Sequence, residues 1–498
     1  MSQHPIGRQA MTGMAWSIFA TGGGRLISLA SIAILARLLT PTHFGLVAFA
    51  LVVIAYVEAV GDLGTSAALI RWPERWREVA QVTFAINVVM GAMWLALTVV
   101  AAPAIARFFG SADGVPVLRA LAWAFVIKGL GNTHDALLQR ELRFQARAIP
   151  EVSLLVVKAA VAIPLAFEGF GAWSLVWGQL VGQAVWTVLL WVLVPWRPAR
   201  TMPSATLVRQ VFGFGRGIVS VNVLAALVHH VDVVVIGRAF GAATLGLYQM
   251  AEKLPDLAIT LVTRSASKVL FPVFGRLQAG ADGLRDMYTT SLRYLSLLTT
   301  PAAIALMLLA EPIVLTVLGP PWRPAVPILR ALAAYAGIRA LSASAGDVLK
   351  AVGRPGALAA LAAVRAVVLV PALILATAMG PVAVAWTLAA VTTVATMTNI
   401  AFVCRVATIP PSAILEALRP GFGAGAVLAA SLVIAMRWTA SVPPLLQLIA
   451  ASIAGIAAYG IALRVISPAT WREVRRIVTE RRQRIDRTAA SLAGAEAQ

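Results

Sequence analysis

Long apolar segments dominate this sequence, and the first two, residues 14–36 and 44–70, strongly limit how the chain can fold. Each is longer than the ~20 residues that a helix needs to cross the hydrocarbon of a bilayer. A backbone inside lipid must satisfy its own hydrogen bonds, so only helices and closed β-barrels cross it. Barrel strands are alternating segments of about 10 residues. The much longer continuous runs therefore predict transmembrane helices.

The composition agrees with this interpretation. Hydrophobic residues make up 60% of the chain, charged residues 12%, and the mean hydropathy is +0.84, whereas soluble domains carry roughly 25% charged residues. The sequence predicts an all-α polytopic membrane protein with about fourteen spans. The predicted spans are 14–36, 44–70, 79–102, 116–138, 148–167, 171–194, 212–236, 245–272, 291–310, 325–349, 357–378, 382–403, 419–436 and 445–466.

The basic residues are placed as in a membrane protein rather than a nucleic-acid-binding one. The net charge is +20, but the arginines gather in every second connection between apolar runs. This is the positive-inside pattern, which predicts that both termini are cytoplasmic. It makes membrane lipids the expected partners of the basic segment 471–487, and nucleic acid is not expected. The single cysteine, Cys404, cannot form an intramolecular disulfide.

The chain also repeats itself. Residues 36–46 are similar to 237–247, and residues 115–122 are similar to 326–333. Because both offsets cover an even number of spans, the two halves are expected to have the same topology, as in transporters that work by rocking one half against the other. The predicted division is an N-terminal lobe of six helices (1–200), a C-terminal lobe of six (201–410), two further helices (411–470) and a basic tail (471–498).

Charged residues inside the spans are candidates for a functional site, since each costs about 2.5–3.5 kcal/mol to insert. The expected cations near mid-membrane are Arg25, Lys128, Lys158, Arg339 and Arg365. The acids that could couple transport to an ion, or pair with these cations, are Glu58, Asp62, Glu252 and Asp256. Two interpretations stay open. The cations line a substrate path, or they hold helices together through pairs such as Arg25 with Glu58.

Several stretches, in the same order along the chain, resemble polysaccharide transporters of the Wzx type. They are 35–41 with 44–46, 62–70, 137–144 and 241–248. That family belongs to a superfamily with the MATE drug exporters and the lipid II flippases. The likeness covers about residues 13–466, and the shared stretches lie in turns and at helix ends. For this reason the resemblance assigns no substrate-binding residue.

The resemblance implies two six-helix lobes around a central cavity, with two extra helices. It implies transfer of an undecaprenyl-pyrophosphate-linked oligosaccharide across the bacterial inner membrane, for O-antigen, capsule or exopolysaccharide synthesis. A polymerase and the machinery that sets chain length are then candidate partners. A cavity lined by Arg and Lys would replace the hydration that a pyrophosphate loses in the membrane.

The same residues leave an alternative function open. An ion-coupled multidrug antiporter or a lipid II flippase of the same fold is the alternative, although a cationic midplane counts against cationic drugs. A membrane enzyme would need catalytic groups on a sizeable loop or domain. The sequence shows no such loop, no nucleophile–base arrangement and no metal-ligand spacing. We therefore expect a transporter without a cofactor or a metal.

Overall fold

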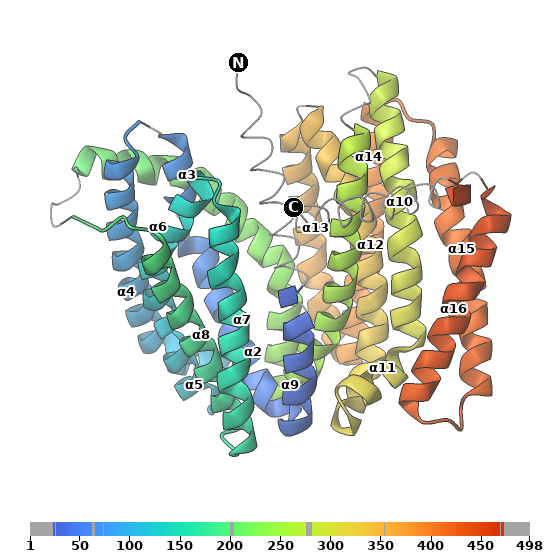
Figure 1. Cartoon of the computed structure of the whole chain (residues 1–498), viewed down its shortest axis with the longest axis horizontal. Coiled ribbons are helices and arrows are strands. Elements are labelled where there is room, and N and C mark those ends of the chain that lie inside the picture. The colour runs from blue at the N-terminus through green and yellow to red at the C-terminus, as the bar shows by residue number, and fades with distance from the viewer. Residues whose placement is uncertain are drawn as a thin grey trace, which may run out of the picture. The chain divides into compact units, whose positions relative to one another are not determined.

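The computed structural model describes residues 23–472, apart from 25, 62–64, 73, 200–203, 275–280, 353 and 469, and every described element is a helix (Figure 1). A short apolar helix, Leu26–Leu38, comes first. The α-helices that follow are α2 (Pro41–Gly61), α3 (Thr65–Arg71), α4 (Trp76–Phe108), α5 (Gly114–Leu121), α6 (Trp123–Arg140), α7 (Phe144–Phe167), α8 (Ala172–Leu193), α9 (Ala205–Phe274), α10 (Ala281–Leu308), α11 (Ala310–Val317), α12 (Val326–Ala351), α13 (Pro355–Ala376), α14 (Pro381–Val406), α15 (Pro411–Trp438) and α16 (Pro444–Ile466). Two 3-10 helices are η1 (Pro320–Ala325) and η2 (Thr377–Met379).

Among the described residues, 12 helical segments are long and apolar enough to cross a membrane. One of them, Asn222–Ile259, contains a break at Gly241, where φ is +77°. Glycine suits this position because a side chain is strained at positive φ. The break separates the predicted spans 212–236 and 245–272. The other predicted spans also overlap described helices. Span 44–70 overlaps α2 and α3, span 116–138 overlaps α5 and α6, and Leu26–Leu38 overlaps 14–36. The prediction of an all-α polytopic protein is confirmed.

Proline begins many of these helices, which explains why apolar runs separated by short connections fold as distinct helices. Helices α2, α13, α14, α15 and α16 all have proline as their first residue. Proline at this position loses no helical hydrogen bond, since the first N–H groups of a helix have no partner within it.

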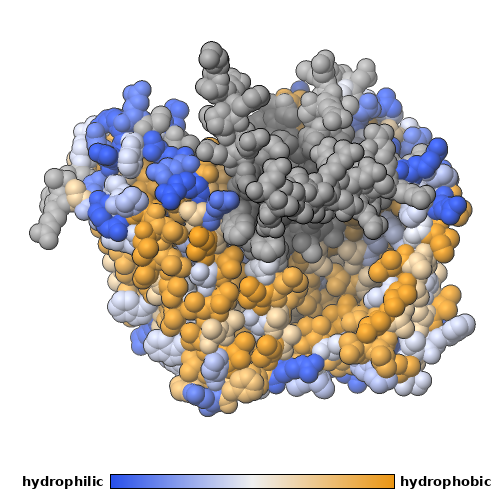
Figure 2. Space-filling model, in the orientation of Figure 1, coloured by the Kyte–Doolittle hydropathy of each residue, from blue (hydrophilic) through white to orange (hydrophobic). Residues whose placement is uncertain are grey.

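Large apolar side chains on the outward helix faces remain exposed, such as Val100 at 78% and Ile456 at 74%. Hydrophobic residues cover the long sides of the helices in Figure 2, and hydrophilic ones gather at their ends. Such surfaces suit contact with lipid.

The chain divides into two compact units. Unit 1 comprises Met1–Lys253, Val317–Ile328 and Ala362–Leu388, and unit 2 comprises Leu254–Thr316, Leu329–Leu361 and Ala389–Gln498. Within unit 1, α7 packs along α8, and α6 packs against both α4 and α8 (Figure 1). Within unit 2, α15 packs between α10 and α16. Helix α9 contributes to both units.

A hydrogen bond joins the two parts of α9 on either side of the Gly241 break. The Tyr248 hydroxyl donates to Asp232 Oδ2 over 2.6 Å, and Asp232 is only 3% exposed. A buried carboxylate is costly unless it is hydrogen-bonded. This contact therefore helps to hold the bend at Gly241, and the residues after it up to Lys253 belong to unit 1.

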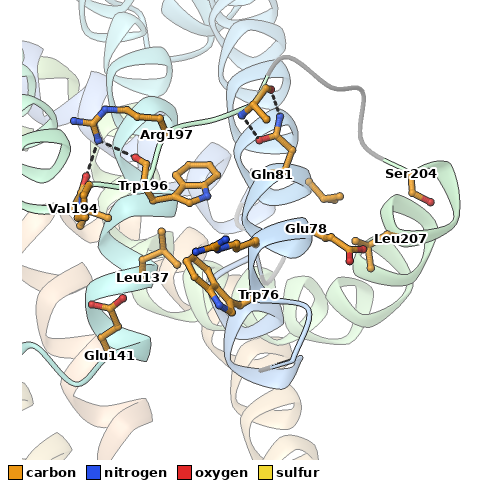
Figure 3. A pocket seen from close by; sticks show the side chains of 14 residues that line it. Trp76, Glu78, Gln81, Leu137, Glu141, Val194, Trp196, Arg197, Ser204 and Leu207 are labelled. Atoms are coloured by element: carbon orange, nitrogen blue, oxygen red, sulfur yellow. Dashed lines mark hydrogen bonds between the residues drawn. The ribbon is translucent and has the colours of Figure 1, made fainter.

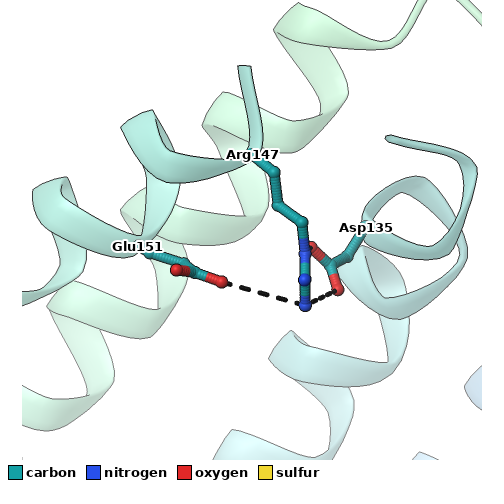
Figure 4. A network of polar contacts seen from close by, with 3 residues as sticks. All are labelled: Asp135, Arg147 and Glu151. Carbon is teal, nitrogen blue, oxygen red and sulfur yellow. Dashed lines mark hydrogen bonds and ion pairs between the residues drawn. The ribbon is translucent and has the colours of Figure 1, made fainter. Parts of the chain in front are cut away.

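An ion-pair network connects the end of α6 to α7 (Figure 4). Arg147 donates from Nε to Asp135 Oδ1 at 2.7 Å and from Nη2 to Asp135 Oδ2 at 3.0 Å, and its Nη2 lies 3.8 Å from Glu151 Oε1. The Asp135 side chain is 19% exposed and that of Arg147 is 32% exposed. Two parallel bonds to one carboxylate form a strong and directional pair.

Changing Arg147 to Met is expected to destabilise the protein by roughly 1–3 kcal/mol, because Asp135 would lose its partner while remaining mostly buried. The measurement is thermal unfolding in detergent. Arg143 is a matched control, since its pair with Glu141 is long (3.5 Å) and its side chain is 45% exposed. Such exposed pairs contribute about 0–1 kcal/mol. An equal loss for Arg143→Met and Arg147→Met would contradict this role for Asp135.

Candidate functional site

Two pockets lie among the spans of unit 1, and residues predicted to form the site line both of them. The first has a volume of about 260 Å³ and is called the lysine pocket below. Its polar lining consists of Ser28, Ser31, Lys158, Gln179, His230, Gln249, Glu252 and Lys253. The helix Leu26–Leu38 together with α2, α7, α8 and α9 supplies the walls.

Close packing of α7 on α8 positions Lys158. Cβ atoms added at Gly178 and Gly182 would lie 2.8 Å from the Lys158 carbonyl oxygen and 3.0 Å from that of Leu154. Small residues let helix backbones approach in this way inside membranes. The Lys158 Nζ then donates to Gln179 Oε1 on α8 over 2.6 Å. The ammonium group is thereby held against the pocket wall without an acidic partner in that bond.

Lys253 reaches the same pocket from α9, and its side chain is exposed there. Lys158 and Lys253 thus line one pocket. Among the described residues that line the pocket, Glu252 is the only carboxylate, so two lysines and one glutamate give a formal charge of +1 with neutral histidine. Electrostatic interactions strengthen where protein replaces water. The lysine pocket can therefore attract and hold an anion.

The second pocket, called the Glu58–Lys128 pocket below, has a volume of about 450 Å³. Lys128 Nζ on α6 donates to Glu58 Oε2 on α2 over 2.8 Å, with side chains 38% and 35% exposed. The other polar residues lining it are Asn87, Trp94, Asn132 and Asn222. Ala55 lines this pocket and the lysine pocket alike, so the two adjoin. Because its two charges cancel, this pocket does not favour an anion.

Unit 2 holds a third pair of predicted residues. Arg339 Nη2 on α12 donates to Asp256 Oδ1 over 2.6 Å, and the Arg339 guanidinium lies 5.3 Å from the ring centroid of Tyr335. A guanidinium over an aromatic face gains further attraction. Here the interpretation of paired cations that hold helices together is supported, since both charges of the pair are compensated.

The remaining predicted site residues are less well placed. Arg365 lies half-buried on α13 in unit 1. Arg25 and Asp62 lie outside the described residues, and their roles stay predictions. Glu58 has Lys128 as a partner, whereas the suggested pair of Arg25 with Glu58 is untested. In the described part of the chain no three His, Cys, Asp or Glu side chains are grouped as metal ligands.

A larger pocket of about 620 Å³ lies at the ends of α4, α6 and α8 and contains none of the predicted site residues (Figure 3). Its polar groups have local structural partners. Arg197 donates to the carbonyl oxygens of Val194 and Trp196 at 2.7 and 2.8 Å, which ends α8. The Gln81 side chain donates to and accepts from the backbone of Ala199. We assign this pocket to the packing of the helix ends.

Sequence reasoning missed Lys253 and the asparagines of the second pocket. Lys253 lies in the predicted span 245–272, and a single sequence does not reveal which residues of separate spans share a pocket. The asparagines did leave a signal. The whole chain contains only four, Asn87, Asn132, Asn222 and Asn399, and all of them lie within predicted spans.

Comparisons with known proteins agree with the resemblance in the sequence. The succinoglycan biosynthesis transport protein ExoT of Rhizobium meliloti (strain 1021) is 29% identical over 355 residues, covering 71% of this chain and 72% of that protein. The teichuronic acid biosynthesis protein TuaB of Bacillus subtilis (strain 168) is 26% identical over 351 residues, covering 70% of this chain and 72% of that protein.

Solved structures support the fold. The lipid II flippase MurJ, in an inward closed conformation, has a TM-score of 0.70 and 14% identity, covering 93% of this chain and 99% of that one. This confirms the fold that the sequence resemblance implied. The model of a family described as "Polysaccharide biosynthesis protein" matches residues 34–327. Since this match covers more than half of the 498 residues, the chain belongs to that family of polysaccharide biosynthesis proteins.

Proposed function

We propose that this protein is a flippase that moves oligosaccharide units linked to undecaprenyl pyrophosphate across the bacterial inner membrane. The observation that carries the proposal is the lysine pocket, a cationic pocket among membrane-spanning helices in a polysaccharide biosynthesis protein. A pyrophosphate head group is anionic and cannot cross hydrocarbon unaided. The lysine pocket supplies the cations that such a head group requires.

The lysines suit this substrate in a specific way. Each ammonium group offers three donors on a flexible stem, so Lys158 and Lys253 can follow a phosphate group as it moves. Lys158 is bound to the neutral Gln179, so no carboxylate has to be displaced from that hydrogen bond. Exchanging one neutral acceptor for a phosphate oxygen strengthens that hydrogen bond, because the new acceptor is charged.

Transport follows by alternating access between the two predicted lobes, 1–200 and 201–410, while the lipid tail stays in the bilayer. Both termini are cytoplasmic in this proposal, as the arginine distribution indicates. The exported glycan enters a cell-surface or secreted polysaccharide, which makes a polymerase and a chain-length regulator candidate partners. The chain moves its substrate and forms no covalent intermediate with it, so it is a transporter and no enzyme.

The alternative is an ion-coupled multidrug antiporter or a lipid II flippase. Exporters of cationic drugs require an acidic pocket, and the charge of +1 among the groups lining the lysine pocket counts against them. The likeness to MurJ concerns the fold alone at 14% identity. Lipid II shares the pyrophosphate, so the two flippase functions differ only in the glycan, which an experiment can identify.

Deleting the gene in its native bacterium is expected to stop surface or secreted polysaccharide production and to leave a lipid-linked oligosaccharide on the cytoplasmic side. The measurement is extraction of lipid-linked glycans, with their orientation determined in membrane vesicles by access of a sugar-binding lectin. Restoring the gene should remove the accumulated lipid. Accumulation of lipid II in its place would support the alternative, and no accumulation of any lipid-linked glycan would contradict both.

A further inference from the structure

Asparagine is rare in this chain, and its few copies gather in one place. The sequence contains four. Three of them, Asn87, Asn132 and Asn222, line the Glu58–Lys128 pocket, and they come from α4, α6 and α9. The fourth, Asn399, lies in unit 2, where it donates to the Ser342 hydroxyl over 3.0 Å. Three helices thus each bring a rare amide to the same pocket. Asn87 already donates to the Thr133 hydroxyl on α6 over 3.2 Å, so the amides of Asn132 and Asn222 are the ones that suggest a ligand.

These groups suit an uncharged ligand rich in hydroxyls. A carboxamide both donates and accepts hydrogen bonds, as a sugar hydroxyl does. The ion pair of Glu58 with Lys128 adds an acceptor and a donor without adding net charge. An indole face can also pack on the apolar face of a pyranose ring, and Trp94 supplies an indole to the lining.

Trp94 gives an independent sign that a ligand is expected. Its Nε1 is buried and has no hydrogen-bond partner among the residues that the structure describes. Buried donors in proteins nearly always have an acceptor, so an orphan of this kind requires an explanation. An oxygen atom of a ligand in the pocket would satisfy it. The volume of about 450 Å³ falls within the range of roughly 300–1,000 Å³ that is usual for small-molecule sites.

The two pockets adjoin at Ala55. In a glycan linked to a lipid through pyrophosphate, the first sugar is bonded directly to the phosphate. An anion held by Lys158 and Lys253 would therefore place the next sugar ring beside Glu58 and Lys128. We infer that the Glu58–Lys128 pocket binds an uncharged sugar ring of the cargo next to its pyrophosphate. This inference rests on the proposed function and adds to it the part of the site that recognises the glycan.

The test compares two kinds of lipid on the full-length purified protein in lipid nanodiscs. The probes are undecaprenyl pyrophosphate and the same lipid carrying one glucose, galactose or N-acetylglucosamine. Binding to the unmodified protein is expected to be about tenfold tighter for at least one sugar-bearing lipid than for the bare lipid. Asn132→Ala and Asn222→Ala should each reduce this preference severalfold and leave binding of the bare lipid unchanged. Asn399→Ala, a matched loss of an amide in unit 2, should keep the full preference.

The outcomes separate this inference from the proposed function. Equal binding of bare and sugar-bearing lipids by the unmodified protein would overturn the inference and leave the proposed function standing. An equal loss of both lipids in the Asn132 and Asn222 variants would show that these amides hold helices together, and would also overturn it. If the unmodified protein binds no lipid pyrophosphate, the proposed function fails and the inference fails with it.

Discussion

Changing Lys158 and Lys253 together to Met is expected to abolish glycan export while the amount of protein in the membrane stays unchanged. Both lysines line the lysine pocket. Counted over its described residues, which include one carboxylate, Glu252, the double variant changes the formal charge from +1 to −1. A pocket with negative charge repels a pyrophosphate. The measurement is polysaccharide output in the gene-deletion strain complemented with each variant, alongside the protein level in isolated membranes.

The size of the effect follows from the strength of charged hydrogen bonds. A hydrogen bond to a charged group contributes roughly 1.5–3 kcal/mol, so each lysine is expected to account for about a 10- to 100-fold change in affinity. Each single variant should then retain weak export and the double variant none. Folding should not suffer, because replacing an inserted cation with an apolar side chain removes a cost of about 2.5–3.5 kcal/mol.

Two controls make this result specific. Lys158→Arg keeps the charge and should keep most of the activity, whereas Lys158→Met should not. Arg464→Met removes an exposed cation near the end of α16, outside the pockets of unit 1, and should leave export unchanged. Normal export by the double variant would contradict the role of the lysine pocket. A loss that followed total protein charge would do so too, since Arg464→Met would then reduce export.

The helices could be predicted from the sequence because a long apolar run that crosses lipid has to form a helix. Residues 212–236 and 245–272 illustrate how far this goes. Their apolar pattern predicted two spans, and the structure has two helical parts that join at Gly241. The pattern did not reveal the hydrogen bond between Tyr248 and Asp232, which joins the two parts from opposite sides of the break.

The site was predictable only in part, because it depends on how separate helices pack together. An inserted charge is conspicuous in any sequence, so Glu58, Lys128 and Lys158 were identified. Which charges share a pocket depends on the packing of separate helices, which hydropathy does not encode. For this reason Lys253 was missed, and the sequence left open whether Arg339 lines a substrate path or pairs with an acid; in the structure it donates to Asp256. Whether Arg365 faces a substrate stays a prediction.

The internal repeat has a structural meaning that the sequence did not show. The repeated stretches 36–46 and 237–247 contain matching glycines, Gly45 and Gly246, and these lie against each other's segments. A Cβ on Gly45 would collide with the carbonyl oxygen of Ala242, and a Cβ on Gly246 would collide with that of Pro41. The two related stretches therefore pack reciprocally, backbone against backbone, within unit 1.

Trp322 also packs against the first of these two stretches. Its Nε1 donates to the Ala36 carbonyl oxygen over 2.8 Å, its ring meets that of Phe44 at 5.3 Å between centroids, and its side chain is fully buried. The stretch that most resembles the transporter family thus serves to assemble the fold. This explains why the resemblance extends to turns and helix ends and assigns no substrate-binding residue.

Changing Gly45 or Gly246 to Ala is therefore expected to destabilise the protein strongly. Overpacking in a protein core costs roughly 1–3 kcal/mol and at times more, and here the obstacle is backbone that cannot rotate away. We expect either variant to lower the unfolding temperature in detergent and the protein level in the membrane. Gly213 is the matched control on α9, since a Cβ there meets nothing within 4 Å. Gly213→Ala should be neutral or stabilise by up to about 1 kcal/mol through helix propensity. Normal stability of Gly45→Ala would show that the two repeated stretches do not pack backbone against backbone.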